Sequence, residues 1–273
     1  MKKFAVIGDP IEHSLSPLLH NWVYEHLGLD AAYDKIRVPN SELGDCMDKI
    51  RNGELNGINV TIPHKIEIMD YVDDINSRAK SIGAINVVTF QNGNIIGNNT
   101  DWYGFALALK NNKIDVNQKE VILLGAGGVS KGIIFALKQQ GIKKIHLLNR
   151  TFEKISHLCD ELIHPHKMDD LENIIQKESI IINCTSVGMN TQESPIDSLL
   201  LSENQTVIDT VYIPLKTKLI VDAESVGAHT MTGLDMFIYQ ALASQDLWFG
   251  ETISNRVDVS TLRKYLVNVL ASS

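Results

Sequence analysis

The stretch Asn59-Val60-Thr61-Ile62-Pro63-His64-Lys65 carries an amide, a hydroxyl and an amine within a short span of sequence. Its first half alternates like a buried strand, and beyond the turn at Pro63 a helix is expected from Lys65 to Tyr71. A lysine ammonium can protonate an oxygen on which negative charge develops during a reaction. Most lysines at helix starts are only solvated, so this stretch gives a hypothesis of proton chemistry at Lys65 that the rest of the chain must support.

Asp101 is the candidate partner for this lysine. It follows Asn98-Asn99-Thr100 and begins a segment expected to be helical as far as Asn111. An aspartate at this place can orient or accept a proton. It is equally well suited to cap the helix, and the sequence leaves both roles open for Asp101.

Two serines near the N-terminus offer a site for an anion. Ser14-Leu15-Ser16-Pro17 precedes a helix expected from Pro17 to Leu27, with Ser16 as its N-cap and Gly28 at its end. Hydroxyl and free N–H groups at a helix N-terminus favour a bound carboxylate, because the helix dipole is positive there. Simple capping by these serines is the alternative.

A glycine-rich turn indicates a dinucleotide site. Glu120 to Leu124 is expected to be a strand, and it leads through Gly125-Ala126-Gly127-Gly128-Val129 into a helix that reaches Gln140. In this context the glycines allow a pyrophosphate to approach the helix N-terminus. Ser130 stands where the usual pattern has its third glycine.

The following strand, Lys144 to Leu148, bears on the choice of cofactor. It ends in Asn149-Arg150-Thr151, with Lys154 one turn further on. An NAD site has an acidic residue here, which would repel a 2′-phosphate, whereas an arginine binds that phosphate with two parallel hydrogen bonds. The pattern predicts NADP, although Arg150 could instead be an ordinary surface residue.

Composition narrows the class of protein. Hydrophobic content of 44%, charged content of 21% and a net charge of −8 are typical of a globular protein that binds neither nucleic acid nor an anionic membrane. Cys46, Cys159 and Cys184 are too scattered for a disulfide framework. His164-Pro165-His166 has no further ligand at metal-binding spacing, so no metal is expected. We expect a cytoplasmic protein.

The order of the motifs resembles the shikimate dehydrogenase family over essentially the full chain. These enzymes reduce 3-dehydroshikimate to shikimate with NADPH in aromatic amino-acid biosynthesis. The resemblance rests on the following segments: Ser14 to Pro17, Asn59 to Lys65, Ile82 to Asn86, Asn99 to Asp101 with Gly104, Gly125 to Gly128, Asn149 to Thr151, Thr185 to Met189, Asp209 to Pro214, and Gly233 to Gln240.

The resemblance implies a role for each matching residue. Lys65 and Asp101 match the catalytic pair. The implied substrate contacts are Ser14, Ser16, Asn59, Thr61, Lys65, Asn86, Asp101, Tyr212 and Gln240. The implied cofactor contacts are Gly125, Ala126, Gly127, Gly128, Val129, Asn149, Arg150, Thr151, Lys154, Thr210 and Gly233. The partner is a small molecule, and the chain is a monomer or a homodimer.

The implied fold is α/β with two domains. Residues 1–101 and 235–273 form a substrate domain with a mostly parallel sheet, and residues 102–234 form a Rossmann-type NADP domain. The resemblance also implies an active site in the cleft between them. Val87 and Ser77 depart from the usual pattern, and Ser77 is given no cofactor contact for that reason. The alternatives are a quinate/shikimate dehydrogenase and a non-catalytic NADP-binding regulator.

Overall fold

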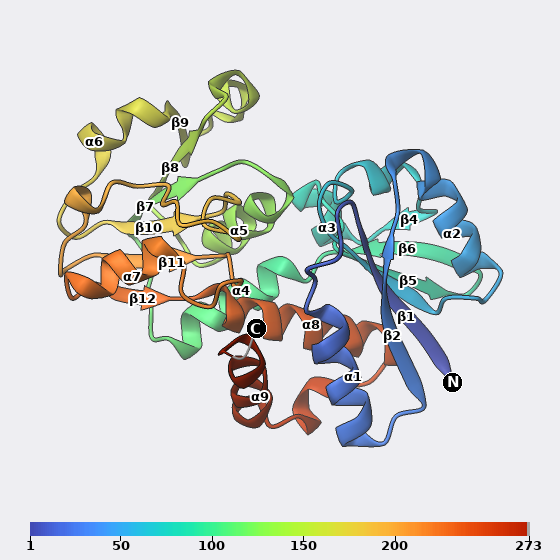
Figure 1. Cartoon of the computed structure of the whole chain (residues 1–273). Coiled ribbons are helices and arrows are strands. Elements are labelled where there is room, and N and C mark those ends of the chain that lie inside the picture. The colour runs from blue at the N-terminus through green and yellow to red at the C-terminus, as the bar shows by residue number, and fades with distance from the viewer. Residues whose placement is uncertain (272–273) are drawn as a thin grey trace. The chain divides into compact units, whose positions relative to one another are not determined.

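The computed structural model of the chain describes residues 1–271, which divide into two units (Figure 1). Unit 1 contains Met1–Gly104 and Ile238–Leu266. Unit 2 contains Phe105–Phe237 and the end of the chain from Val267. The domain boundaries assigned from the sequence, 1–101 with 235–273 and 102–234, stay a prediction.

Unit 1 is built on a mixed six-stranded sheet with the order β2-β1-β3-β5-β6-β4. Strand β1 lies between β2 and β3 and is parallel to both, whereas β5 is antiparallel to both β3 and β6. The strands are β1 (Lys2–Gly8), β2 (Ala31–Arg37), β3 (Gly57–Val60), β4 (Asp74–Ile75), β5 (Val87–Gln91) and β6 (Asn94–Asn98). Asn92 and Gly93 join β5 to β6 with positive φ angles of 51° and 84°, as their sequence indicates.

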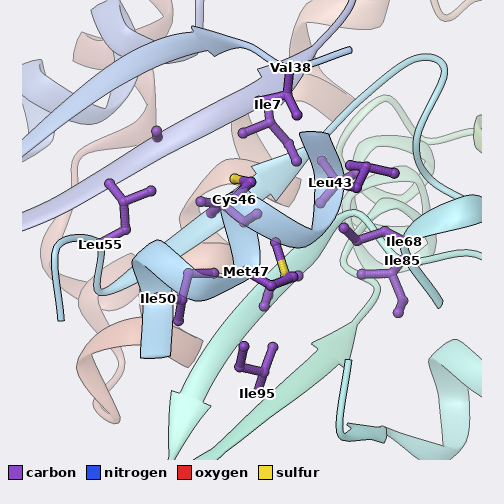
Figure 2. Close-up of a cluster of buried hydrophobic side chains, with 14 of the residues drawn as sticks. Ile7, Val38, Leu43, Cys46, Met47, Ile50, Leu55, Ile68, Ile85 and Ile95 are labelled. Carbon is purple, nitrogen blue, oxygen red and sulfur yellow. The ribbon is translucent and has the colours of Figure 1, made fainter. Parts of the chain in front are cut away.

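The helices that begin in unit 1 are α1 (Ser16–Leu27), α2 (Leu43–Arg51), α3 (Ser77–Ile82), α4 (Asp101–Asn111) and α9 (Val259–Ala271), and α8 (Gly233–Phe249) enters it from unit 2. Helix α2 contributes Leu43, Cys46, Met47 and Ile50 to a buried cluster (Figure 2). Residues of the sheet and its loops, Ile7 and Ile85 among them, complete this core. Burial of this apolar area stabilises the packing of α2 against the sheet.

Unit 2 has a second six-stranded sheet, in which every pairing is parallel, with the order β12-β11-β10-β7-β8-β9. The strands are β7 (Glu120–Leu124), β8 (Lys144–Asn149), β9 (Ile163–Lys167), β10 (Ile180–Asn183), β11 (Thr206–Asp209) and β12 (His229–Met231). Its other helices are α5 (Gly128–Gln139), α6 (Leu171–Ile174) and α7 (Lys218–Ser225). This Rossmann-type order confirms the predicted fold class.

Two local predictions need correction. The segment from Lys65 begins as a turn and contains only a short 3-10 helix, Glu67–Asp70. The Lys65 carbonyl accepts from the Ile85 N–H at 2.7 Å, so it is not available to a regular helix. In α1 the N-cap is Leu15, and Ser16 lies inside the helix.

Within residues 1–271, none of the helices is both long and apolar enough to cross a membrane. Across the same residues, no group of three or more His, Cys, Asp and Glu side chains is placed to hold a metal ion. His164 and His166 lie in β9, and His166 Nε2 is 3.1 Å from His146 Nδ1.

We predict that Gly57→Ala destabilises unit 1 strongly. A Cβ atom at Gly57 would lie 2.6 Å from Trp248 Cδ1 and 2.9 Å from the Val88 carbonyl oxygen, so the buried indole would have to move. The expected loss is about 3 kcal/mol of unfolding free energy, measured by urea titration.

Gly44→Ala is the matched control for this substitution. Gly44 lies in α2, where the nearest atom to an added Cβ is 3.8 Å away. Alanine there should leave stability unchanged or raise it by about 0.5–1 kcal/mol, because it has the higher helix propensity. Equal effects of the two substitutions would contradict the packing argument.

Candidate active site

Lys65 and Asp101 form a buried ion pair in unit 1. Lys65 Nζ lies 2.6 Å from Asp101 Oδ2, and the two side chains are 9% and 5% exposed. Lys65 is fixed at its backbone, where its carbonyl accepts from Ile85 in the segment before β5. Asp101 is fixed as the first residue of α4. Residues 36 positions apart in sequence are thus joined at hydrogen-bond distance.

The carboxylate of Asp101 bonds to Lys65 and Asn86, and a different residue accepts from the backbone N–H at the start of the helix. Asn99 Oδ1 accepts from the Asp101 N–H at 3.0 Å, so the asparagine serves the backbone at the helix start. Asp101 Oδ2 accepts from Lys65, and Asp101 Oδ1 accepts from Asn86 Nδ2 at 2.9 Å. Both carboxylate oxygens therefore have partners, as a buried charge requires.

Asn86 holds the carboxylate in place. It precedes β5, and its own N–H donates to the Asn98 carbonyl at 3.0 Å. Its Nδ2 also lies 3.0 Å from Thr100 Oγ1 and 3.3 Å from Gln240 Oε1, and its Oδ1 accepts from the Thr100 N–H at 2.7 Å. The amide is 2% exposed, so most of its hydrogen-bonding capacity serves the protein.

Asn59 lies at the end of β3 in the same polar cluster. Its Oδ1 accepts from Tyr33 Oη at 2.7 Å, and the Tyr33 ring stacks on His20 with centroids 4.0 Å apart. Its Nδ2 donates to the Asn86 carbonyl at 3.1 Å and to Ser244 Oγ at 3.0 Å. Both amide hydrogens of Asn59 are therefore engaged, which leaves an oxygen lone pair as its means of contact with a ligand.

Thr61 is positioned by the turn between β3 and Lys65. Its N–H donates to the Ile7 carbonyl at 3.0 Å, and its carbonyl accepts from His64 at 2.9 Å. The side chain is half-buried. Thr61, Asn59 and Lys65 thus come from one continuous segment whose backbone is hydrogen-bonded to its neighbours.

The two serines lie at the start of α1. Ser14 Oγ accepts from the Ser16 N–H at 3.3 Å, and Ser16 is 8% exposed. The first turn of α1 has no acidic residue, so its positive end stays attractive to an anion. The loop after β1 is tied to β2 by the 2.7 Å ion pair of Arg37 with Asp9.

The glycine-rich turn of unit 2 suits a pyrophosphate. Gly125 has a φ of +95°, and a Cβ there would lie 2.9 Å from Thr185 Cγ2. Gly127 is the N-cap of α5 without a side-chain cap bond, an added Cβ on it would meet nothing within 4 Å, and the first turn carries no acidic residue. The free N–H groups of this helix end are therefore accessible to a phosphate group.

The neighbouring positions of this turn also fit a dinucleotide. Ala126 and Val129 are half-buried, and Gly128 begins the helix. Ser130 is fully buried, so the space that a third glycine usually occupies here accommodates a small hydroxyl side chain.

Polar and basic residues follow β8. Asn149 Nδ2 donates to the Thr151 carbonyl at 2.8 Å and shapes the turn that presents Arg150. Arg150, Thr151 and Lys154 are all exposed. A cation and two neutral polar groups at this strand end fit a 2′-phosphate, and no carboxylate opposes it at 149–151.

Asp209 is a functional candidate whose role the sequence did not reveal. It ends β11 in register with Asn183 of β10 and is 0% exposed. Its carboxylate accepts from Asn183 Nδ2 at 3.0 Å, from the Val211 N–H at 3.0 Å and from Thr217 Oγ1 at 2.6 Å. Burial raises the pKa of Asp209 to about 6, against the opposing effect of these donors.

This carboxylate ties together the two loops beyond β10 and β11. Asn183 Oδ1 accepts from the N–H and hydroxyl of Thr185, and its backbone carbonyl accepts from the Thr210 N–H at 3.0 Å. Gly233 packs so closely on the Thr210 carbonyl that no side chain fits. Tyr212 stacks on Phe237, with centroids 4.5 Å apart. Thr210, Tyr212 and Gly233 are therefore each held by contacts within unit 2.

We predict a pH signature from Asp209 in unfolding. The pKa of Asp209 in the folded protein is raised to about 6 from 3.8, so the folded state holds the Asp209 proton more tightly than the unfolded state does. This contribution to the unfolding free energy is complete below about pH 4 and is lost as the pH rises to about 6. Asp209→Asn removes this titration. Relative to the variant, the unmodified chain should lose about 3 kcal/mol of unfolding free energy across that window. Parallel stability curves of the two proteins would contradict the assignment.

Two family models match the chain. The model of the shikimate dehydrogenase substrate binding domain matches residues 6–88, and the model named shikimate / quinate 5-dehydrogenase matches residues 106–200. A shikimate dehydrogenase (NADP(+)) of Bacillus cereus is 39% identical over 257 residues, which covers 91% of this chain and 93% of that relative.

Solved structures agree with these matches. The shikimate 5-dehydrogenase of Thermus thermophilus, in complex with NADP(H) and shikimate, is 31% identical with a TM-score of 0.85, and the match covers 97% of this chain and 98% of that one. The quinate dehydrogenase of Corynebacterium glutamicum, in complex with NAD, is 25% identical with a TM-score of 0.88, and the match covers 98% and 99%. With this identity and coverage, the chain belongs to the shikimate dehydrogenase family.

Proposed function

We propose that this chain catalyses the reversible NADPH-dependent reduction of 3-dehydroshikimate to shikimate in aromatic amino-acid biosynthesis. Lys65 and Asp101 are its proton-transfer pair in this proposal. The observation that carries it is the buried contact of 2.6 Å between Lys65 Nζ and Asp101 Oδ2, with Asn86 on the other carboxylate oxygen. The chain that holds this pair belongs to the shikimate dehydrogenase family.

In the reduction, negative charge develops on the ketone oxygen and must be neutralised as it forms. Lys65 donates a proton from Nζ to that oxygen, and in the reverse direction it accepts the proton of the hydroxyl. Asp101 orients the amine through Oδ2. Asn86 keeps the carboxylate from rotating, because it donates to Oδ1. NADPH, when bound, supplies the hydride.

The substrate contacts in the proposal follow its functional groups. Ser14 and Ser16 bind the carboxylate, supported by the positive end of α1. The other contacts are to ring hydroxyls or the carboxylate, and they comprise Asn59, Thr61, Asn86, Tyr212 and Gln240. The substrate domain in the proposal is 1–101 with 235–273.

NADP is assigned to the 102–234 domain. The pyrophosphate binds at Gly125, Ala126, Gly127, Gly128 and Val129, where the N-terminus of α5 has no side-chain cap. Asn149, Arg150, Thr151 and Lys154 bind the adenosine end, and Thr210 and Gly233 the nicotinamide side. The free cysteines are in keeping with a cytoplasmic location, and the chain is a monomer or a homodimer.

A quinate/shikimate dehydrogenase is the second candidate, because the quinate dehydrogenase of C. glutamicum has a TM-score of 0.88 with this chain. Assays of the purified chain with shikimate and quinate, each with NADP and NAD, separate the two. We expect shikimate with NADP to have the highest kcat/KM. A higher value for quinate with NAD would favour the second candidate. Binding of NADP without any shikimate-dependent reduction would favour a regulator.

We predict that Lys65→Ala lowers kcat by roughly 10²- to 10⁴-fold, the usual contribution of a positioned acid. The KM for shikimate should change much less, because the serines and amides still bind the substrate. Steady-state NADPH formation measures both constants. Near-normal turnover would contradict the catalytic role.

Asp101→Asn is the companion substitution. Asparagine is as good a helix cap as aspartate, so a capping role predicts normal activity. Loss of the charge that orients Lys65 should instead lower kcat while circular dichroism stays unchanged.

We predict that Arg150→Ala weakens NADPH binding roughly 10- to 100-fold, as expected for the loss of a charged hydrogen bond to the 2′-phosphate. NADH binding should be nearly unaffected because that cofactor lacks the phosphate. Fluorescence titration with both cofactors measures the two dissociation constants. An equal loss for NADH would show that Arg150 does not read the 2′-phosphate.

A further inference from the structure

We propose that Ser244 of α8 is a positioning residue, whose hydroxyl fixes the side chains of Thr100 and Asn59 and through them the Asn86 amide that holds Asp101. This inference rests on the proposed function, because it gives Ser244 a part in the proton-transfer site. The hydrogen-bond partners of Ser244 Oγ are Asn59, Thr100 and Gln240, so Ser244 acts on the ion pair through these neighbours.

Ser244 lies at the meeting point of three segments. Its Oγ is 3.0 Å from Asn59 Nδ2 at the end of β3, 3.2 Å from Thr100 Oγ1 before α4, and 2.9 Å from the Gln240 carbonyl one turn earlier in α8. The side chain is 0% exposed. All of these residues belong to unit 1.

The direction of each hydrogen bond follows from the number of protons. The Ser244 hydroxyl has one hydrogen, and it donates to the Gln240 carbonyl, a common bond of helical serines to the preceding turn. Both oxygen lone pairs are then left for donors. Asn59 Nδ2 can only donate, so it takes one of them. The Thr100 hydroxyl must therefore donate to the other.

The donors and acceptors of Thr100 and Asn86 link Ser244 to Asp101. Since Thr100 donates to Ser244, its own oxygen is free to accept from Asn86 Nδ2 at 3.0 Å. The second Nδ2 hydrogen of Asn86 has two acceptors within reach, and the shorter contact, 2.9 Å to Asp101 Oδ1 against 3.3 Å to Gln240 Oε1, directs it to Asp101. A single oriented chain of hydrogen bonds thus runs from the backbone of α8 through Ser244, Thr100 and Asn86 to the carboxylate that pairs with Lys65. We call this chain of hydrogen bonds the relay.

Removal of the Ser244 hydroxyl would disturb both of its partners. Asn59 Nδ2 would keep a buried hydrogen without its acceptor, which is unfavourable. The Thr100 hydroxyl would turn to its remaining acceptor, Asn86 Oδ1, at 3.3 Å. Thr100 would then both donate to and accept from one amide group, so the orientation of Asn86 toward Asp101 would be held less firmly.

The test is a double-mutant cycle of Ser244→Ala and Thr100→Val with steady-state kinetics and urea unfolding. Each substitution alone should lower kcat for shikimate oxidation roughly ten-fold, about the effect of one buried hydrogen bond. The KM for NADP should not change, because the proposed cofactor residues are in unit 2. The double variant should be no slower than Thr100→Val alone, within about two-fold, since both changes break one relay.

Ser254→Ala is the matched control. Ser254 Oγ donates to Asp246 Oδ2 of α8 at 2.6 Å, so this variant also removes a hydrogen-bonded serine next to the same helix. Its kcat should equal that of the unmodified chain. A kcat of Ser244→Ala within two-fold of the unmodified chain, or effects of the two substitutions that multiply, would overturn the proposal.

An inactive unmodified chain would overturn the proposed function and with it the positioning role of Ser244. The unfolding data still decide on the relay in that case, because the two substitutions must couple in unfolding free energy if the hydroxyls are linked. Additive unfolding effects would show that no relay exists. Coupling in unfolding together with a coupled fall in kcat would support the inference in full.

Discussion

The ion pair between Lys65 and Asp101 is the interaction on which the site depends. Two charges that are 9% and 5% exposed have lost most of their hydration, and their attraction offsets that loss only if the geometry is good and the remaining polar atoms are satisfied. Asn86 and Asn99 meet this requirement at Asp101, and Thr100 in turn holds the Asn86 amide. The polar cluster in unit 1 therefore both permits the pair to be buried and orients it.

Unit 2 uses a buried carboxylate for a different purpose. The hydrogen-bond donors to Asp209 among residues 1–271 are neutral groups, and burial raises the pKa of Asp209 more than these donors lower it. Its bonds to Asn183, Val211 and Thr217 shape the loops that follow β10 and β11. Ligands of open parallel sheets bind at this edge, so rigid loops there suit the proposed nicotinamide contacts.

The α/β fold with two domains was implied by the resemblance to the family, and the Asn92-Gly93 pair between β5 and β6 is a turn signal that is local in the sequence. The helix expected from Lys65 failed because a tertiary bond to Ile85 takes the Lys65 carbonyl. Ser244 was not predicted, since a serine in a helix gives no signal of which distant donors reach it. Its spacing of four from Gln240, which places both on one face of α8, is the clue that was available.

Chemical rescue of Lys65→Ala by ethylammonium tests the central claim most directly, that an amine paired with Asp101 moves the proton. The small amine can enter the space that the lysine side chain leaves beside Asp101. The account predicts that NADPH formation from NADP and shikimate rises with ethylammonium concentration and saturates. Absence of any amine-dependent rise, in a variant that still binds NADP and shikimate, would contradict the account.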